Sequence, residues 1–529
     1  MIERCFDKAD RGESIWLPAL RREFDGDPHS EKLIIRLVGA HYGMRDYSLS
    51  LPHAQNKKDE TFLLRFLAAN VYNLLSAFSA SEVCFYCNEE TETLSRRIPP
   101  LFEHSGGLGK VCSIARRIYG SFSFRFLPMD EYRAANAPCA SSGPVLAESL
   151  RRRIEASGTR ACVGIDVGGS DIKLAVSCKG NLLYTKEYDW NPAASATAEG
   201  IIDPILALIR EARDRIEQNG ASLDAVGISF PDIVIDDRIV GGETPKTRGM
   251  RENRLLDYEA EFEKLRDLKA RILPLCAPGA SVRLTNDGNM AAFTAAAELA
   301  AGGEDAAIGR GVIAHSLGTD LGTGWLEADG TIPSFPLEMY DLLLDLGNYP
   351  ASALPAADLR STRNENSGMP GVRRYLGQAA AYRLAWKLDP GLLRGFVKKD
   401  GEILTIPTAP EDLRKPCLEH LMRLAAEGNQ DAEEIFRIIG TNLSVVACEM
   451  SWLFGDTPPL RFLFGRFVKS RRCFDLISEG FERGKSGIRL VAADDALANT
   501  PLMRRLAQSP GVTVAQFAQA IGAIYFAIE

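Results

Sequence analysis

Three short stretches of the chain combine glycine, hydroxyl and carboxylate side chains as phosphoryl transfer requires. That reaction needs a cradle for nucleotide phosphates, a metal ion and a base that orients the attacking hydroxyl. The first stretch is DVGGSDIK, residues 166–173. Its glycine pair lets backbone N–H groups approach an anion, and Asp166 could hold Mg²⁺ through water. The candidate phosphate contacts here are Gly168, Gly169, Ser170 and Lys173. An ordinary hairpin turn is the alternative interpretation of a glycine pair.

The second stretch is HSLGTDLGTGW, residues 315–325. Gly318, Thr319, Gly322 and Thr323 make a second candidate phosphate loop between two predicted strands. A glycine hairpin is again the alternative. Two such loops at similar positions in two half-domains favour the phosphate interpretation over a pair of plain turns.

The third stretch is VRLTNDGNMAAF, residues 282–293. Asp287 follows a predicted buried strand and precedes a predicted helix, and an acid at a strand end beside a cleft can accept the proton of a hydroxyl. Asn286 could fix a neighbouring hydroxyl group. The alternative is that Asn286 and Asp287 only cap the helix.

The elements that must position these stretches begin at Ala161, where short apolar strands alternate with amphipathic helices. Three successive strands, a helix and further strand–helix units occur twice around a cleft. This pattern predicts an α/β, actin/hexokinase-like (ribonuclease H-like) fold of two lobes. We expect an N-terminal α/β extension over residues 1–158, a first lobe over 159–290 and a second lobe over 291–529.

Taken together, the three stretches resemble the ROK family (repressors, open reading frames and kinases). DVGGSDIK is similar to the family's DxGGTxxK hairpin, LTNDGNMAA to its NDANxAA segment with the catalytic base, and SLGTDLGTG to its LGTGIGGG loop. The resemblance runs from Ala161 to Glu529. It implies an ATP- and Mg²⁺-dependent kinase that phosphorylates a hydroxyl of a sugar or sugar derivative. Asp287 would be the base, Asn286 and Glu338 would hold the sugar, and Gly465 would lie near the nucleoside.

Several positions depart from the family pattern. The family's zinc-binding His is replaced by Asp341, and no cysteine occurs between Cys276 and Cys417, so no zinc is expected. Lys246 follows Pro245 where the family has a sugar-binding Asn, and Asp320 replaces a glycine of the second loop. We therefore keep Lys246 and Asp341 as candidate substrate contacts. The departures also support an alternative, a catalytically inactive sugar-sensing or scaffolding protein.

The extension contains a helix-then-strand pattern, residues 56–87, that resembles residues 429–465. We interpret it as a degenerate copy of the C-terminal lobe that packs on the body and carries no chemistry; an unrelated α/β extension is the alternative. Its lack of a compact basic three-helix pattern and the formal charge of −8 argue against a nucleic-acid partner. The polar N-terminus and the lack of an 18-residue apolar run predict a cytoplasmic protein without a membrane partner. A homodimer is compatible with these features.

Overall fold

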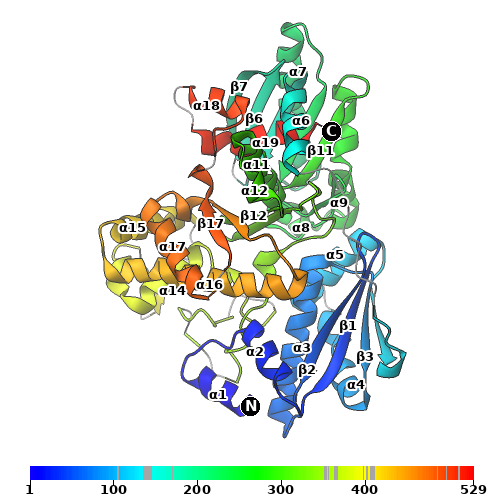
Figure 1. Ribbon diagram of the computed structural model, residues 1–529, viewed down its shortest axis with the longest axis vertical. Helices are drawn as coiled ribbons and strands as arrows, with labels where there is room; N and C mark the ends of the chain where they lie inside the picture. Colours follow the sequence, from blue (N-terminus) through cyan, green and yellow to red (C-terminus); the bar gives the residue numbers. More distant parts are fainter. Residues whose placement is uncertain are drawn as a thin grey trace.

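The computed structural model of the chain contains three sheets of four or five strands, each covered by helices (Figure 1). The residues that it describes are 1–103, 107–134, 146–169, 171–350, 354–355, 357–362, 367–396, 398–400, 403–405, 411–484, 487–495, 497–509 and 513–528.

The first lobe is built on a five-stranded sheet in the order β11-β8-β5-β6-β7. β6 is antiparallel to both of its neighbours, β5 and β7, while β8 and β11 run parallel to β5. One face packs on α7 (Glu199–Gln218), and the other on α19 (Val514–Phe526). The strands are β5 (Ala161–Val167), β6 (Asp171–Cys178), β7 (Asn181–Asp189), β8 (Ala225–Phe230) and β11 (Ser281–Asn286).

Two glycines allow α19 to approach this sheet closely. A Cβ atom at Gly164 would lie 1.8 Å from the carbonyl oxygen of Ala520, and one at Gly227 would lie 1.9 Å from that of Ala523. Any larger residue would push the helix away from the strands. The last helix of the chain is therefore part of the first lobe's core.

The second lobe has a four-stranded sheet in the order β13-β12-β16-β17. β13 is antiparallel to β12, whereas β16 and β17 are parallel to it. An antiparallel hairpin followed by parallel strands thus occurs in both lobes, which confirms the predicted actin/hexokinase-like fold. The main elements of this lobe are β12 (Val312–Leu317), β13 (Leu321–Leu326), α13 (Val372–Tyr375), α14 (Gln378–Leu388), α15 (Glu411–Ala426), α16 (Gln430–Phe454), β16 (Leu460–Phe464), α17 (Arg471–Gly484) and β17 (Arg489–Ala492). Helix α18 (Pro501–Ala507) follows and packs on α19 and β7 of the first lobe.

Helix α11 (Asp287–Gly302) connects the two lobes. It packs on β12 and β13 of the second sheet and on α19 of the first lobe. The expected boundary between residues 290 and 291 therefore falls inside this helix. Because α11 begins at Asp287, the N-terminus of the helix lies where the two sheets meet.

The extension has its own four-stranded sheet, in the order β2-β1-β3-β4, with α3 packed against it in the lower part of Figure 1. The sequence analysis did not identify its β1–β2 hairpin. Its elements are α1 (Ile2–Asp10), α2 (Leu17–Asp25), β1 (Glu31–Gly39), β2 (Gly43–Leu51), α3 (Lys57–Phe78), β3 (Glu82–Cys87), α4 (Glu89–Ser95), α5 (Lys110–Tyr119) and β4 (Ser123–Pro128).

In both the extension and the second lobe, a hairpin is followed later in the chain by a long helix, a strand, helical structure and a strand. The match is not complete, because α13, α14 and α15 precede the long helix of the second lobe and two helices, α4 and α5, separate β3 from β4. The strand orders β2-β1-β3-β4 and β13-β12-β16-β17 also correspond. The direction of the hairpin differs, because β1 is antiparallel to β3 whereas β12 is parallel to β16. The helix that follows, α6 (Leu146–Ser157), leaves the extension and packs on α11 and α19. That the extension is a degenerate copy of the C-terminal lobe stays a prediction, and the reversed hairpin is a difference that such a copy would have to have acquired.

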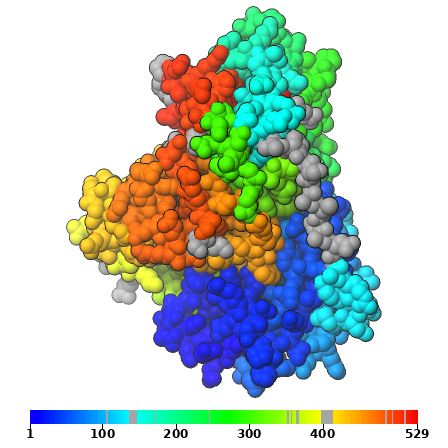
Figure 2. Space-filling model, viewed as in Figure 1, coloured from blue at the N-terminus to red at the C-terminus, as the bar shows by residue number. Residues whose placement is uncertain are grey.

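The extension is packed on the body, as predicted. Its buried apolar residues and those of α16 and α17 form one continuous cluster. In Figure 2 the blue N-terminal residues lie directly below the orange C-terminal helices. Helix α3 is long and apolar enough to cross a membrane, but 83% of its most apolar window is buried inside the protein. It is therefore a core helix that joins the extension to the second lobe.

Candidate active site

Three carboxylates follow the parallel strands of the first-lobe sheet. Asp166 lies near the end of β5, Asp232 follows β8, and Asp287 follows β11. Parallel strands place their carboxyl ends along one edge of a sheet, which is where α/β folds bind ligands. Asp166 and Asp287 were predicted as site residues. Asp232 was not, although its place after a buried strand is the same signal.

The predicted base, Asp287, is held at the N-terminus of α11. Its Oδ1 accepts a hydrogen bond of 2.9 Å from the backbone N–H of Gly288. Asn286 caps the helix by accepting from the same N–H at 2.8 Å, and its Nδ2 donates to the carbonyl of Asp232 at 2.9 Å. Asn286 therefore caps the helix, and its predicted contact with a substrate hydroxyl stays a prediction. Burial raises the pKa of the Asp287 carboxyl, and the charge of Lys246 opposes that rise.

Lys246 faces these carboxylates. Its stem lies over the first glycine loop, since a Cβ atom at Gly169 would be 3.7 Å from the Lys246 Cε. Burial raises the pKa values of Asp287, Asp232 and Asp320, and the charge of Lys246 opposes each rise. Its ammonium group makes no hydrogen bond or ion pair with any residue that the structure describes. Lys246 is thus an unpaired cation among carboxylates that belong to both lobes.

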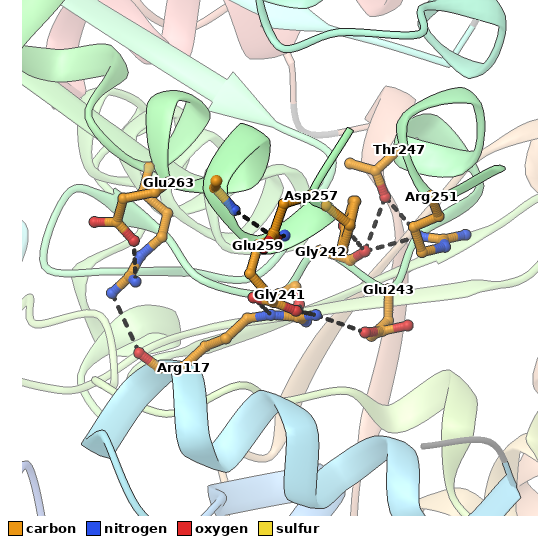
Figure 3. A network of polar contacts seen from close by, with 12 residues as sticks. Arg117, Gly241, Gly242, Glu243, Thr247, Arg251, Asp257, Glu259 and Glu263 are labelled. Atoms are coloured by element: carbon orange, nitrogen blue, oxygen red, sulfur yellow. Dashed lines mark hydrogen bonds and ion pairs between the residues drawn. The ribbon is translucent and has the colours of Figure 1, made fainter. Parts of the chain in front are cut away.

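A network of hydrogen bonds fixes the segment that carries Lys246. The carbonyl of Gly242 accepts from Thr247 Oγ1 at 2.9 Å and from Arg251 at 2.7 Å (Figure 3). The carboxylate of Asp232 accepts from the Gly242 N–H at 3.0 Å. Burial raises the pKa of Asp232 to about 6, although the Gly242 N–H stabilises its charged form. The position of Lys246 is therefore set by the backbone around it.

The first glycine loop is a tight hairpin. The Gly168 N–H donates to the carbonyl of Asp171 at 2.8 Å, and Trp190 donates to the carbonyl of Gly168 at 3.1 Å. Lys173 was predicted to contact phosphates, but its ammonium group is bound to the carboxylate of Asp171. Ser170, also predicted there, lies outside the described residues. Because the N–H of Gly168 is used within the hairpin, the backbone at Gly169 is what the described part of this loop can offer to an anion.

Asp166 lies at the base of this loop. Its Oδ1 accepts a hydrogen bond of 2.9 Å from Ser229. Burial raises the pKa of its carboxyl to about 6, and the charge of Lys173 opposes the rise. The negative charge of Asp287, in contrast, raises the pKa of the Asp166 carboxyl further. The two carboxylates are thus electrostatically coupled within one site.

The second glycine loop joins β12 to β13. The space beside Gly318 is open, with no atom within 4 Å of where its Cβ would be, and its carbonyl accepts from the N–H of Gln378 at 3.0 Å. Thr319 is exposed, while Gly322 lies in β13 opposite Ser316. This leaves Gly318 and Thr319 as the part of the loop that is open to a ligand.

Thr323 and Gly465 have structural roles beside the loop. The Thr323 hydroxyl is buried and lies 3.0 Å from His315 Nδ1, so the side chain that we predicted to contact phosphates points into the lobe instead. Gly465 has a φ of +95°, and a Cβ there would lie 2.2 Å from the carbonyl oxygen of Leu317. Only glycine lets the end of β16 meet the loop so closely.

Glu338 and Asp341 lie on the short 3₁₀ segment η7 (Met339–Asp341) and its cap. Asp341 is buried and bound by the side chains of Lys110 and Arg373, which hold the pKa of its carboxyl below its usual range despite burial. Burial raises the pKa of Glu338 to about 8, together with the charges of Asp341 and Asp232. Asp341 therefore supports this segment, whereas the pKa of Glu338 is raised toward neutral pH and above. The sequence carried no signal for Lys110 or Arg373.

These residues fit a nucleotide and Mg²⁺ in chemical type. Asp166 and the exposed Asp320 supply carboxylate oxygens from the two glycine loops, and Mg²⁺ prefers oxygen ligands. Burial raises the pKa of Asp320, and the charges of Arg373 and Lys246 oppose that rise. The space beside Gly318 is open to a phosphate group, although the N–H groups of Gly168 and Gly318 already donate to the carbonyls of Asp171 and Asp320 within their own loops. The arrangement is therefore suited to phosphoryl transfer onto a group beside Asp287.

No family model matches the chain, and no curated protein matches it. Solved structures do. A ROK family glucokinase from Streptomyces griseus, in complex with glucose and AMPPNP, is 20% identical with a TM-score of 0.42, over 69% of this chain and 98% of that one. A ROK hexokinase from Thermus thermophilus is 17% identical with a TM-score of 0.39, over 69% and 98%. A ROK family transcriptional regulator, a homologue of the E. coli MLC protein, is 14% identical with a TM-score of 0.43, over 70% and 81%.

Because these sequence identities and TM-scores are low, we base the fold assignment on the order and direction of the strands in the two sheets. Kinases and a transcriptional regulator both occur among the matched structures. The motifs of the sequence and the solved structures that it matches name the same family, ROK.

Proposed function

We propose that this protein is a ROK-like, ATP- and Mg²⁺-dependent kinase that phosphorylates a hydroxyl group of a sugar or sugar derivative. The observation that carries the proposal is the position of Asp287. It lies at the start of α11, where Gly288 packs against β13 after the second glycine loop, and it feels the charge of Lys246, which lies beside Gly169 of the first loop. A base, two candidate phosphate loops and a cation thus converge on one site.

In this proposal Asp287 accepts the proton of the attacking hydroxyl, which strengthens the nucleophile as transfer begins. Its Oδ1 is held by the Gly288 N–H, so the carboxylate has a fixed orientation. Lys246 stabilises negative charge that develops on the transferred group and opposes the rise in the pKa of Asp287. Asp166 and Asp320 would hold Mg²⁺, which would neutralise charge on the nucleotide phosphates.

The acceptor would lie on the side of Glu338. At neutral pH a carboxyl with a pKa of about 8 is mostly protonated and can donate a hydrogen bond. Lys246 adds three further donors and a positive charge. Both features favour an acceptor that carries an anionic or strongly accepting group, such as a sugar acid. A neutral hexose would leave the ammonium group without a partner.

Asp320 favours a second candidate function. It adds a carboxylate to the second glycine loop, and a carboxylate repels nucleotide phosphates unless a metal ion or a cation lies between them. If it keeps the nucleotide out, the protein would bind sugars without turnover, as a sensor or scaffold.

A coupled ADP-release assay with Mg·ATP and a panel of neutral sugars, amino sugars and sugar acids separates the two candidates. We expect release with at least one acceptor, with sugar acids preferred, and loss of release in the Asp287→Asn variant. A wild-type protein that binds a sugar of the panel but neither binds nor cleaves Mg·ATP would instead be a sensor.

A further inference from the structure

Helix α5 lies at the edge of the N-terminal extension and faces the first lobe. Val111 and Cys112 belong to the apolar cluster that the extension shares with the second lobe. On another face of the helix, Ile114 packs with Ile233 and Val240 of the first lobe, in a small cluster of its own. The helix is thus anchored by apolar contacts on both sides.

One end of α5 holds the segment that leads to Lys246. Arg117 donates to the carbonyl of Gly241, to Glu243 at 2.9 Å and to Glu259 at 2.7 and 3.0 Å (Figure 3). The Arg117 side chain is only 8% exposed, and burial strengthens such charged bonds. This part of the extension therefore supports the loop on which Lys246 is placed.

The other end of α5 holds the segment of Glu338. The ammonium group of Lys110 is bound to the buried carboxylate of Asp341 and lies 3.4 Å from the hydroxyl of Tyr340. Its positive charge also opposes the rise in the pKa of Glu338. Lys110 is the first residue of the helix and Arg117 lies two turns later, so one short helix reaches both segments.

Helix α3 of the extension holds the same segment through its backbone. The N–H groups of Leu337 and Glu338 donate to the carbonyls of Ala77 and Ser76, at 3.0 and 3.1 Å. These carbonyls belong to the last turn of α3, where no helical partner is available. Asn73 adds two bonds to the backbone of Leu343, accepting its N–H at 2.7 Å and donating to its carbonyl at 2.9 Å.

We propose that the N-terminal extension is a working part of the acceptor site, in which Lys110 is a positioning residue that holds the segment of Glu338 through Asp341. The inference rests on the proposed function for its substrate, but the placement of the segment is testable without turnover. It replaces our expectation that the extension carries no chemistry. Lys110 touches no reacting atom in this account and acts mainly through its bond to Asp341.

The first test is hydrogen–deuterium exchange of the full chain without ligand. In Lys110→Met, amides of residues 337–343 should exchange about tenfold faster, as expected for the loss of one charge-assisted hydrogen bond. Lys32→Met is the matched control, because Lys32 is an exposed lysine of the same extension, on β1. Unchanged exchange in Lys110→Met would overturn the proposal. If this variant fails to fold, Asn73→Ala tests the same segment.

The second test is kinetic and uses the best acceptor of the sugar panel. Lys110→Met should raise the KM for the acceptor at least about tenfold and leave the KM for Mg·ATP within about threefold. Lys110→Arg, which keeps the charge, should restore most of the difference. Equal changes in both KM values would mean that Lys110 is only structural and would overturn the proposal. If the wild type uses no acceptor, the proposed function fails, and the exchange experiment alone decides the role of Lys110.

Discussion

Replacing Arg21 with methionine should destabilise the contact between the extension and the second lobe. Arg21, on α2, is paired with Glu449 of α16, and the Glu449 side chain is completely buried. Asn73 donates to the other oxygen of Glu449 at 2.8 Å. The Arg21 guanidinium also lies 3.9 Å from the ring centre of Trp452. In Arg21→Met, Asn73 is the one remaining donor among these, and the buried carboxylate loses its cation.

Breaking a buried pair in this way typically costs about 3–5 kcal/mol, since an uncompensated charge stays in the interior. With a urea m-value of about 3 kcal/mol per molar, such a loss moves the unfolding midpoint down by about 1–2 M. Urea unfolding followed by tryptophan fluorescence measures this shift, because Trp452 reports on the contact itself. The double variant Arg21→Met, Glu449→Leu should recover most of the loss, because it removes both charges.

The matched control is Arg4→Met, which breaks the exposed pair between Arg4 and Glu23. Exposed pairs contribute about 0–1 kcal/mol, so this variant should lower the midpoint by less than about 0.3 M. If Arg21→Met behaved like Arg4→Met, the extension would not be docked on α16 in solution. The reasoning about a shared core would then be refuted.

Three further predictions concern the site. Because the pKa of Glu338 is raised from 4.5 to about 8, the native state binds more protons than the unfolded state between these pH values, and stability should fall as pH rises through that window. In Glu338→Gln the part of the stability loss that comes from this carboxyl should disappear, and the thermal unfolding midpoint measured from pH 5 to pH 8 checks this. Gly324→Ala should cost more than about 2 kcal/mol, since its Cβ would lie 1.8 Å from the Gly288 carbonyl oxygen, whereas Gly318→Ala, with open space, should keep its thermal midpoint and weaken Mg·ATP binding. Lys246→Asn should shift acceptor preference from sugar acids toward neutral hexoses in the ADP-release assay, and an unchanged KM ranking would exclude Lys246 from the acceptor site.

Much of the two-lobed fold could be predicted, because short sequence patterns mark where its strands and helices begin and end. β5, β6 and β7 follow from apolar runs separated by glycine and polar turns, and β11 and α11 from a buried run ending in an Asn–Asp cap. Asp166 and Asp287 could be placed for the same reason. Asp232 carried the same strand-end signal and was overlooked.

Other parts depend on contacts that no local pattern contains. The bond between Lys110 and Asp341 joins residues 231 positions apart, and Arg373 reaches Asp341 from another segment. Strand direction in the extension is also set by tertiary pairing, so the helix–strand pattern there could not show that β1 is antiparallel to β3. The prediction that Thr323 contacts phosphates was wrong, because a hydroxyl side chain in a glycine-rich strand can face either side of the sheet. Here the Thr323 hydroxyl forms a hydrogen bond with the buried His315.

The most direct test of the account is a single-turnover measurement of phosphorylated acceptor with and without Asp287. The enzyme is mixed with Mg·ATP and its preferred acceptor, and the product is quantified by mass spectrometry. We expect the wild type to transfer one phosphoryl group, and Asp287→Asn to be slower by about 10²- to 10⁴-fold with an acceptor Kd within about threefold of the wild type. Equal rates in the two proteins, or no phosphorylated product from a wild type that binds the acceptor, would contradict the account.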